Sequence, residues 1–331
     1  MRHVRLSAGD PRVDRRFEFV EVLEREGDLQ AAQEVLRAIL EIAPDWVYGW
    51  YKLGCLAQDA GERCAAVDAW QQALRLDPDD TLGAGIMLEV AGARAMQAQM
   101  PAAFVEALFD QYAERFDRSL VEQLGYRVPQ RLGALVSEVS QARFAQALDL
   151  GCGTGLSGAA FRPICDHLSG VDLSSAMLRK AQKRSVYDVL TKGDIGKLPP
   201  LDAPVYDLVL AADVLIYLGD LTVISHWVAQ ALNGGGVFAF SVEAATENAS
   251  YVIQPSRRYA HARCYIEQIF GAKGWSIFTL SHEVLRQDRG RDVWGYLCVV
   301  RRDREVAHRP AMAIDVRPRA IEGDGADPIA H

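Results

Sequence analysis

The sequence predicts an α/β protein, in which a largely parallel sheet flanked by helices follows a small all-α module at the N-terminus. Three observations support this fold class. Residues 13–46 align with residues 47–80 at an offset of 34. From about Gln141, short β-branched runs alternate with amphipathic stretches, and a glycine-rich turn follows the first run. Such alternation is typical of βαβ units and a parallel sheet.

The composition is that of an ordinary globular protein with room for two domains. Of its 331 residues, 50% are hydrophobic, and the formal net charge is −8. The acidic balance argues against a nucleic-acid partner, because phosphate binding needs an excess of Lys and Arg on one face. The N-terminus lacks the apolar stretch of a signal peptide, and no apolar run reaches the roughly 20 residues that span a bilayer. We therefore expect a soluble, cytoplasmic protein that binds neither nucleic acid nor membrane.

Cysteine and histidine spacing gives no indication of a metal site. The 6 cysteines are scattered without a C-x-x-C pair, and the 7 histidines show no zinc-binding pattern. A chain of this size does not need disulfides for stability. Reduced thiols and no metal are the expectation.

The N-terminal repeat is supported by residues with definite physical roles. Glycine permits the tight turn between paired helices, alanine lets them approach closely, and proline ends the second helix. The pairs at the offset of 34 are Gly27 and Gly61, Ala32 and Ala66, Leu36 and Trp70, Leu40 and Leu74, Pro44 and Pro78, and Asp45 and Asp79. The segment resembles tetratricopeptide repeats. Its first copy is degenerate, with Arg16, Phe19 and Val20 where the second has Trp50, Leu53 and Gly54.

Residues 1–98 are therefore expected to form a tetratricopeptide-repeat-like helical module. A third helix over roughly 81–96 would cap the apolar face left open by the second repeat. Such a module either docks a peptide or partner protein, or packs as an extension that shields the rest of the chain or mediates formation of a homodimer.

The remaining chain is divided by its periodicity. Residues 99–140 are expected to be a helical connector, 141–302 the α/β domain and 303–331 a flexible tail. Strands are predicted near 146–150, 168–172, 188–192, 206–212, 235–242, 275–282 and 292–300, and helices near 156–166, 175–184, 221–232 and 259–272. The last two strands are expected to pair as an antiparallel hairpin at the end of a seven-stranded sheet.

An apolar strand over 147–150 ends in the turn Gly151-Cys152-Gly153-Thr154-Gly155, which opens a helix. Glycines are needed at such a corner because a ligand lies against bare backbone and because the turn uses dihedral angles that other residues avoid. Backbone N–H groups then face the ligand. The spacing from Gly153 to Gly158 also fits the dinucleotide pattern G-x-G-x-x-G, so the turn alone does not decide the cofactor.

The acid within the strand, Asp149, and the dense spacing of Gly151, Gly153 and Gly155 resemble the first motif of class I S-adenosylmethionine-dependent methyltransferases. This resemblance implies a Rossmann-like methyltransferase sheet and S-adenosylmethionine as cofactor. It also implies that Asp149 organises the loop around the methionine end of the cofactor. Asp172, at the end of the next strand, is then positioned to accept both ribose hydroxyls.

The following strands fit the same family. The resemblance implies that Asp194 accepts a hydrogen bond from the adenine amino group, that Ile195 offers a backbone N–H and an apolar flank, and that small Ala211 leaves room beside the sulfonium. Cys152, Leu173 and Met177 complete the expected cofactor-binding set. The Asn/Asp-Pro-Pro-Tyr loop of enzymes that methylate the amino groups of adenine or glutamine is absent after this strand. Those acceptors are not expected.

A segment before the sheet, residues 108–117, resembles the cofactor-covering helix of many small-molecule methyltransferases. The resemblance implies that Tyr112 reaches the cofactor carboxylate and that Arg127 adds a charge-assisted contact. Leu120 and Leu124 continue its apolar face. An ordinary amphipathic connector is the alternative.

The loops after the fifth strand should border the acceptor pocket, because ligands bind at the carboxyl ends of parallel strands. Alignment of the acceptor is the main catalytic contribution to methyl transfer. A hydroxyl acceptor must also lose its proton, for which a histidine is the natural base. His261 is the first candidate, with Glu243 or Tyr217 as alternatives or orienting partners. Arg257 and Arg258 either pair with an acceptor carboxylate or form a solvated basic pair.

Taken whole, the chain resembles a group of bacterial methyltransferases that carry tetratricopeptide repeats, with matching segments at 109–117 and 258–261. The sequence therefore predicts an S-adenosylmethionine-dependent enzyme that methylates oxygen or nitrogen of a small-molecule acceptor. Two alternatives remain: a protein methyltransferase that recruits its substrate through the repeats, and an interaction adaptor that only binds the cofactor.

Overall fold

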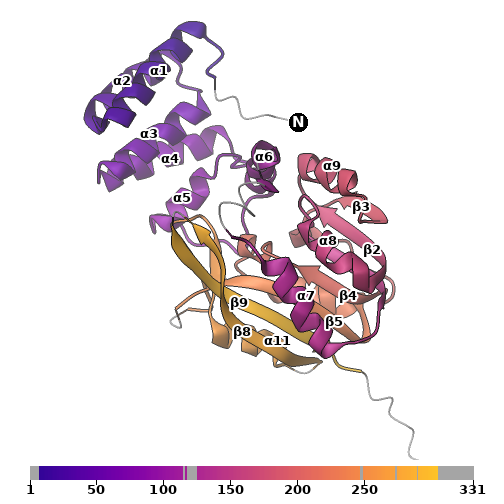
Figure 1. The fold of residues 1–331 in the computed structure, drawn as a ribbon. Coiled ribbons are helices and arrows are strands. Elements are labelled where there is room, and N and C mark those ends of the chain that lie inside the picture. The colour runs from indigo at the N-terminus through magenta and orange to yellow at the C-terminus, as the bar shows by residue number, and fades with distance from the viewer. Residues whose placement is uncertain are drawn as a thin grey trace, which may run out of the picture.

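The computed structural model describes residues 7–114, 116–117, 125–246, 249–272, 274–288 and 290–304. Helices α1–α5 stack beside an α/β sheet, and α6 lies between that stack and α9 (Figure 1). The helices before the sheet are α1 (Pro11–Glu26), α2 (Leu29–Ile42), α3 (Val47–Asp59), α4 (Arg63–Leu76), α5 (Ala84–Val90), α6 (Ala102–Tyr112) and α7 (Val128–Val139). Residues 305–331 of the expected tail lie outside the described residues.

Each 34-residue unit folds as a helical hairpin, α1 with α2 and α3 with α4. The turns need glycine for their backbone conformation, since Gly27 has φ +81° and Gly61 has φ +79°, while an added Cβ would meet nothing within 4 Å at either position. Close packing explains Gly54, where a Cβ would lie 2.3 Å from Nε1 of Trp70 on the partner helix. The repeat in the sequence therefore corresponds to a repeat in the structure.

The capping helix is shorter than the predicted 81–96. Helix α5 covers Ala84–Val90, because Gly83 (φ +77°) precedes it in the left-handed region and Gly92 (φ +67°) follows it. Beyond α5, Gln99 instead forms an isolated antiparallel bridge with Leu218, which follows the 3-10 turn Leu215–Tyr217.

The sheet has strand order β3-β2-β1-β4-β5-β7-β6, with β9 antiparallel to β5 and β8 antiparallel to β9. Its strands are β1 (Phe144–Leu150), β2 (Cys165–Asp172), β3 (Val189–Lys192), β4 (Tyr206–Ala211), β5 (Leu232–Ala244), β6 (Tyr251–Ile253), β7 (Tyr259–His261), β8 (Trp275–Asp288) and β9 (Arg291–Arg302). The remaining helices are α8 (Leu156–Phe161), α9 (Ser175–Arg184), α10 (Thr222–Ala231) and α11 (Arg263–Phe270), with 3-10 turns η2 (Arg162–Ile164), η3 (Ile195–Lys197) and η4 (Leu215–Tyr217).

The described chain contains nine strands, so the prediction of a seven-stranded sheet is wrong in number. The additional hairpin pairs β6 with β7, and β7 adds to the edge of β5 where Glu243 pairs with Ala260. The start of the predicted helix 259–272 is therefore a strand, followed by α11. All three β7 residues are buried, so this short strand shows no alternation by which to predict it.

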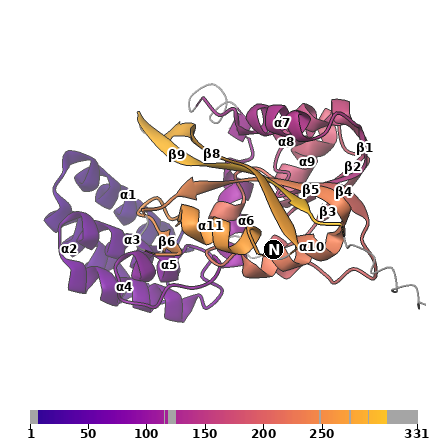
Figure 2. The same ribbon diagram turned by 90° about the horizontal axis from the view of Figure 1, so that it is seen from below.

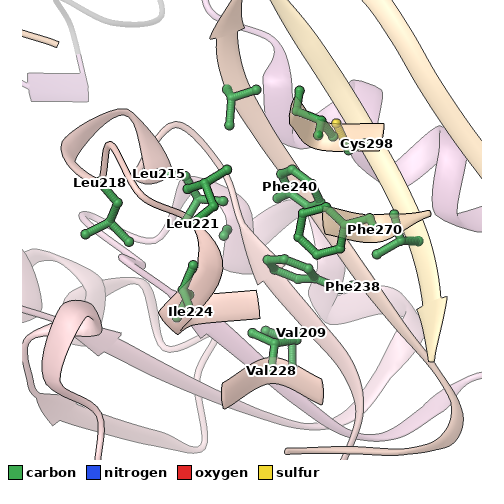
Figure 3. Close-up of a cluster of buried hydrophobic side chains, with 14 of the residues drawn as sticks. Val209, Leu215, Leu218, Leu221, Ile224, Val228, Phe238, Phe240, Phe270 and Cys298 are labelled. Atoms are coloured by element: carbon green, nitrogen blue, oxygen red, sulfur yellow. The ribbon is translucent and has the colours of Figure 1, made fainter. Parts of the chain in front are cut away.

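Hydrophobic cores cover both faces of the sheet. The core under α10 and α11 includes Phe238 and Phe240, whose stacked rings lie 4.6 Å apart, and Phe270 against them (Figure 3). Helices α7 and α8 cover the opposite face, with Leu132 and Phe161 fully buried (Figure 2). These layers fix the carboxyl ends of β1, β2, β4 and β5 at one edge.

The helical stack contacts the sheet close to that edge. A shared apolar cluster joins Ile86 of α5 and Phe104 of α6 to Tyr217 of η4 and Tyr259 of β7. The N–H of Met100 donates to the carbonyl of Tyr217 at 3.0 Å, and the Tyr259 hydroxyl donates to the carbonyl at residue 97 at 2.9 Å. The stack is therefore joined to η4 and β7 by side chains and backbone alike.

Among the described helices, none combines the length and apolar character needed to cross a membrane. The described residues also contain no group of three or more His, Cys, Asp or Glu side chains arranged to hold a metal ion.

Candidate functional site

The glycine turn after β1 has the conformation that its sequence predicted. Gly151, Gly153 and Gly155 have φ of +67°, +53° and +93°, a region that residues with a Cβ rarely adopt. At Gly151 a Cβ would lie 2.3 Å from Val214, so the loop after β4 approaches the turn closely. At Gly153 the nearest atom would be a backbone oxygen at 4.0 Å, which leaves open space on that side of the turn. A ligand therefore has access to bare backbone at Gly153.

Asp172, at the end of β2, joins the second strand to this turn. Its Oδ2 accepts a hydrogen bond from the N–H of Gly153 and its Oδ1 accepts one from the N–H of Ser174, both at 2.8 Å. Burial raises the pKa of Asp172 to about 6, against the lowering effect of these two backbone donors. Each carboxylate oxygen has a second lone pair. The Asp172 carboxylate can therefore still accept hydrogen bonds from the two hydroxyls of a ribose.

Asp149 is fully buried behind the turn. Its Oδ2 accepts a hydrogen bond from the hydroxyl of Tyr187 at 2.7 Å, and its Oδ1 has no partner among the described residues. Burial is the main cause that raises the pKa of Asp149 to about 7, and nearby Asp172 raises it further. A buried carboxylate oxygen without a partner fits a donor supplied by a ligand.

Tyr187 was not among the predicted site residues, and it explains the third glycine of the alternative dinucleotide pattern. Its hydroxyl accepts a hydrogen bond from the N–H of Gly158 at 3.1 Å, and a Cβ at Gly158 would lie 2.5 Å from that oxygen. Gly158 therefore makes room for the tyrosine that supports Asp149.

The third predicted acid, Asp194, follows β3 next to Asp172. Parallel pairing of β1 with β2 and of β2 with β3 brings the ends of these strands together, with Asp172 opposite Lys192. Oδ1 of Asp194 accepts a hydrogen bond from the N–H of Gly196 at 2.9 Å. Ile195 is partly buried against the core beside it.

The other predicted cofactor residues are mainly buried. Ala211 and Met177 are 0% exposed, Cys152 is 4% exposed and Leu173 is half-buried. Cys152 donates its N–H to the carbonyl of Val171 at 3.0 Å. The side chains of Met177 and Cys152 therefore contribute to packing around the turn. The open glycine face, the unpartnered oxygen of Asp149 and the free acceptor capacity of Asp172 together fit S-adenosylmethionine, which presents hydroxyl and ammonium donors.

Acidic side chains attach the connector helix α6 and the residues after it to α9. Asp110 accepts hydrogen bonds from the Ser174 hydroxyl at 2.5 Å and the Ala176 N–H at 3.2 Å. Farther along, Glu114 pairs with Lys180 at 2.7 Å and Asp117 pairs with Arg184. Asp117 also accepts a hydrogen bond from the hydroxyl of Thr154 in the glycine turn. The connector is therefore bonded to α9 and to the glycine turn, which together form what is here called the cofactor edge.

Tyr112 does not contribute to this attachment in the described structure. Its side chain is 52% exposed, and Arg127 is exposed at the position before α7. Leu120 and Leu124 lie outside the described residues. The contacts of Asp110, Glu114 and Asp117 were missed, although their spacing on one helical face opposite Lys180 and Arg184 is a signal in the sequence.

A buried ion cluster lies at the ends of β4 and β5. Arg286, from β8, donates to Oδ1 of Asp213 at 2.7 Å and to Glu243. Asp213 has φ +56°, and its N–H donates to the Ser241 hydroxyl at 2.8 Å. Burial raises the pKa of Glu243, and Arg286 opposes that shift. Arg286 was not predicted, because it lies beyond the predicted strand 275–282 and a single arginine carries no sequence signal for distant partners.

The side chains of Arg257 and Arg258 contact different parts of the structure. Arg258 lies 3.9 Å from Glu243 and 3.4 Å from Asp288, so it belongs to the ion cluster. Arg257 donates to the hydroxyl of Tyr51 in the helical stack at 3.0 Å. The alternative of a solvated basic pair is wrong for both residues. Tyr217 is buried beside this cluster, with its ring edge-on to Phe109 at 5.5 Å.

His261 lies in strand β7, not at the start of a helix as predicted, and is 0% exposed. Its Nε2 lies 2.9 Å from the carbonyl of Leu218 and 3.1 Å from that of Gly219, so this nitrogen carries the proton and donates it. Burial lowers the pKa of His261 to about 4. Nδ1 is buried without a partner among the described residues. These surroundings correspond to a neutral histidine that holds the η4 turn, which differs from the predicted general base.

Comparison with known proteins places the glycine turn, Asp172 and Asp194 inside one recognised unit. Residues 148–240 match the family described as Methyltransferase domain. This stretch is a methyltransferase domain. It belongs to the class I type that depends on S-adenosylmethionine, with the α/β fold and mostly parallel sheet described above. The predicted α/β methyltransferase fold with a mostly parallel sheet is thereby confirmed for this domain, although not its strand number, and so is the predicted cofactor.

Curated relatives of the methyltransferase domain act on different acceptors. Malonyl-[acyl-carrier protein] O-methyltransferase of Hamiltonella defensa subsp. Acyrthosiphon pisum (strain 5AT) is 30% identical over 139 residues, which are 41% of this chain and 51% of that protein. Trans-aconitate 2-methyltransferase of Rhizobium leguminosarum bv. trifolii (strain WSM2304) is 33% identical over 107 residues, or 32% of this chain and 41% of that protein. The chain spans about half the length of the curated relatives that it matches.

A solved S-adenosylmethionine-dependent methyltransferase from Mesorhizobium loti is similar to this chain at 22% identity, with a TM-score of 0.42. That similarity covers 52% of this chain and 96% of the other.

Proposed function

We propose that this chain is an S-adenosylmethionine-dependent methyltransferase that methylates oxygen or nitrogen of a small-molecule acceptor. The observation that carries the proposal is the juxtaposition of the open glycine turn with Asp149, Asp172 and Asp194 at one sheet edge. The trans-aconitate relative supports a small-molecule acceptor, because it is named for one, whereas the malonyl relative is named for a malonyl group carried by acyl-carrier protein.

The cofactor supplies a methyl group activated by a positive sulfur. This chain's residues would bind and orient it: Asp172 through the ribose hydroxyls, Asp194 through the adenine amino group, and Asp149 near the methionine end. The buried side chain of Ala211 leaves the end of β4 unobstructed. Orientation of the two reactants is the main contribution that the protein makes to such a displacement.

A carboxylate acceptor suits the acceptor side better than a hydroxyl. A hydroxyl needs a base, and the neutral, buried His261 donates its Nε2 proton to carbonyls. Carboxylic acids are already ionised near pH 7. Both named relatives act on acceptors that carry a carboxylate. Glu243 and Tyr217 remain the candidates for proton transfer if the acceptor is a hydroxyl or amine.

A second candidate is a protein acceptor recruited by the helical module. We assign residues 1–98 to tetratricopeptide repeats on the two helical hairpins spaced by 34 residues. The observation in favour of a protein acceptor is the bond between Tyr51 of this module and Arg257 beside the ion cluster.

Transfer of a tritiated methyl group in extract of the source organism tests the proposal. After reaction with the full-length chain, ultrafiltration separates labelled small molecules from labelled proteins. We expect label in the small-molecule fraction, its loss in Asp172→Ala and its retention in the exposed-site control Asp202→Ala. Label confined to proteins would favour the second candidate. Binding of the cofactor without any transfer would leave the adaptor alternative.

A further inference from the structure

A groove of about 1290 Å³ lies between the ends of the repeat helices and α6. One wall comes from the first turn of α1, the α2–α3 turn and the α4–α5 turn, and the other comes from residues 103–111 of α6. Figure 1 shows α6 facing the α1–α4 stack on one side and α9 on the other. The groove is thus separate from the glycine turn, although α6 borders both.

The walls of the groove carry charge of one sign. Among the described residues that line it, six are acidic and none is Lys, Arg or His; the acids are Asp10, Asp45, Asp77, Asp79, Glu106 and Asp110. Asp45 and Asp79 occupy the same position in the two 34-residue units. The structural repeat therefore places equivalent carboxylates along one wall.

These acids differ in how far their charge is already compensated. Glu106 pairs with Lys192 at 2.6 Å, Asp10 pairs with Arg12 at 2.9 Å, and Asp110 accepts the two hydrogen bonds from α9. Asp45 and Asp79 are exposed and form no ion pair with any described residue. The uncompensated charge of the groove therefore lies on the repeat wall.

Apolar side chains from the same repeat elements form what is here called the floor of the groove. Ile42 is 55% exposed there, which is unusual for a large aliphatic side chain, and Val13 and Leu76 contribute beside it. Trp46 also lines the groove, and its buried indole N–H has no acceptor among the described residues. Apolar side chains therefore lie beside the unpaired carboxylates of the repeat wall.

We propose that this groove binds a basic peptide segment of a partner protein, one in which Lys or Arg alternates with apolar residues. Long basic side chains can cover the apolar floor with their stems while their charged ends meet Asp45 and Asp79. Charge complementarity of this kind sets partner choice. Phosphate-bearing partners would be repelled.

The groove also connects the partner to the methyltransferase domain. Asp110 lines the groove and bonds Ser174 and Ala176, just after Asp172. A bound segment therefore contacts the helix that is attached to the cofactor edge. The proposal goes beyond methyl transfer, since binding at the groove needs no turnover.

Fluorescence anisotropy with the full-length chain tests the groove. The probe is a labelled octapeptide of alternating Arg and Leu, and we expect saturable binding that weakens as salt rises. Asp45→Asn/Asp79→Asn removes two exposed charges that have no ion pair and should raise the Kd at least about fivefold, since two charge pairs are lost. Ile42→Ser should also weaken binding, because it removes the apolar floor without altering charge.

The matched control is Glu34→Gln/Glu41→Gln, which removes two exposed carboxylates of α2 that do not line the groove. This control should bind the peptide like the wild type. Charge reversal in Asp45→Lys/Asp79→Lys should transfer preference to a Glu-Leu octapeptide. Equal losses in the groove and control pairs would overturn the proposal, because attraction would then reflect net charge alone. Preferential binding of a single-stranded RNA oligonucleotide would overturn it as well.

Discussion

Asp172 and Gly153 lie on neighbouring strand ends, and the Oδ2 of the aspartate accepts the backbone N–H of the glycine at 2.8 Å. The acid that was predicted to bind the ribose thus also holds the turn on which the ligand lies. The carboxylate that we propose recognises the cofactor therefore also sets the geometry of the turn.

This coupling predicts that substitutions of Asp172 lower the affinity for S-adenosylmethionine to different degrees. Asp172→Ala should weaken S-adenosylmethionine binding by roughly 10- to 100-fold, because hydrogen bonds to a charged group contribute about 1.5–3 kcal/mol. Asp172→Asn retains one acceptor oxygen and should lie between alanine and wild type. Isothermal titration calorimetry measures both. Wild-type affinity in Asp172→Ala would refute the assignment of this residue.

The support of Asp149 by Tyr187 predicts loss of stability when the pair is broken. Tyr187→Phe removes the hydroxyl bonded to a buried carboxylate and should cost about 1–3 kcal/mol. Gly158→Ala should cost at least as much, since its Cβ would lie 2.5 Å from the Tyr187 oxygen. Urea unfolding of the two variants tests both values. Full stability of Gly158→Ala would show that this contact is not tight in solution.

Buried Asp149 and His261 predict opposite pH dependences in the absence of cofactor. The pKa of Asp149 is raised to about 7, so its contribution to stability is present at low pH and is lost as pH rises from about 4 through 7. Asp172 acts in the same direction, with its pKa raised to about 6. The pKa of His261 is lowered to about 4, so its contribution is present above about 6.5 and is lost as pH falls through 4.

Urea unfolding at several pH values separates the two effects. Between pH 4 and 7 the wild type should lose stability relative to Asp149→Asn. Between pH 4 and 6.5 it should gain stability relative to His261→Gln. Parallel pH profiles for all three proteins would contradict the burial of these groups.

The ion cluster at the ends of β4 and β5 predicts that loss of its buried arginine destabilises the protein more than loss of an exposed one. Arg286→Met should destabilise the protein by about 3–5 kcal/mol, because Asp213 and Glu243 lose the cation buried with them. Arg131→Met breaks a partly exposed pair with Glu283 and should destabilise the protein much less, because solvent screens that pair. Adding Asp213→Asn and Glu243→Gln to Arg286→Met should recover much of the loss. Equal effects of Arg286→Met and Arg131→Met would rule out this account.

Local sequence signals predicted the glycine turn and the helix after β2 well. Helix 175–184 is predicted with the bounds that α9 has, and the structure shows why it begins there: the Ser174 hydroxyl accepts the Met177 N–H at 3.1 Å as an N-cap. The turn over 151–155 was predicted because three glycines at this spacing require unusual dihedral angles. Signals contained within a few residues are therefore sufficient for these elements.

Long-range partners were not predictable in the same way. Arg286 is separated by 43 residues from Glu243, and Tyr187 by 38 from Asp149. Strand β7 is three residues long and buried, so its pairing with β5 depends on the fold around it. The residue type of His261 predicts a base, whereas its burial and its two carbonyl acceptors are consequences of tertiary structure.

Equilibrium dialysis of the full-length chain with S-adenosylmethionine, in parallel with NAD, measures the central claim most directly. The glycine turn fits both cofactor patterns in sequence, so the comparison separates them. We expect one S-adenosylmethionine per chain, no retention of NAD, and loss of binding in Asp172→Ala but not in Asp202→Ala. Preferential retention of NAD, or no binding of S-adenosylmethionine by the folded wild-type protein, would contradict the account.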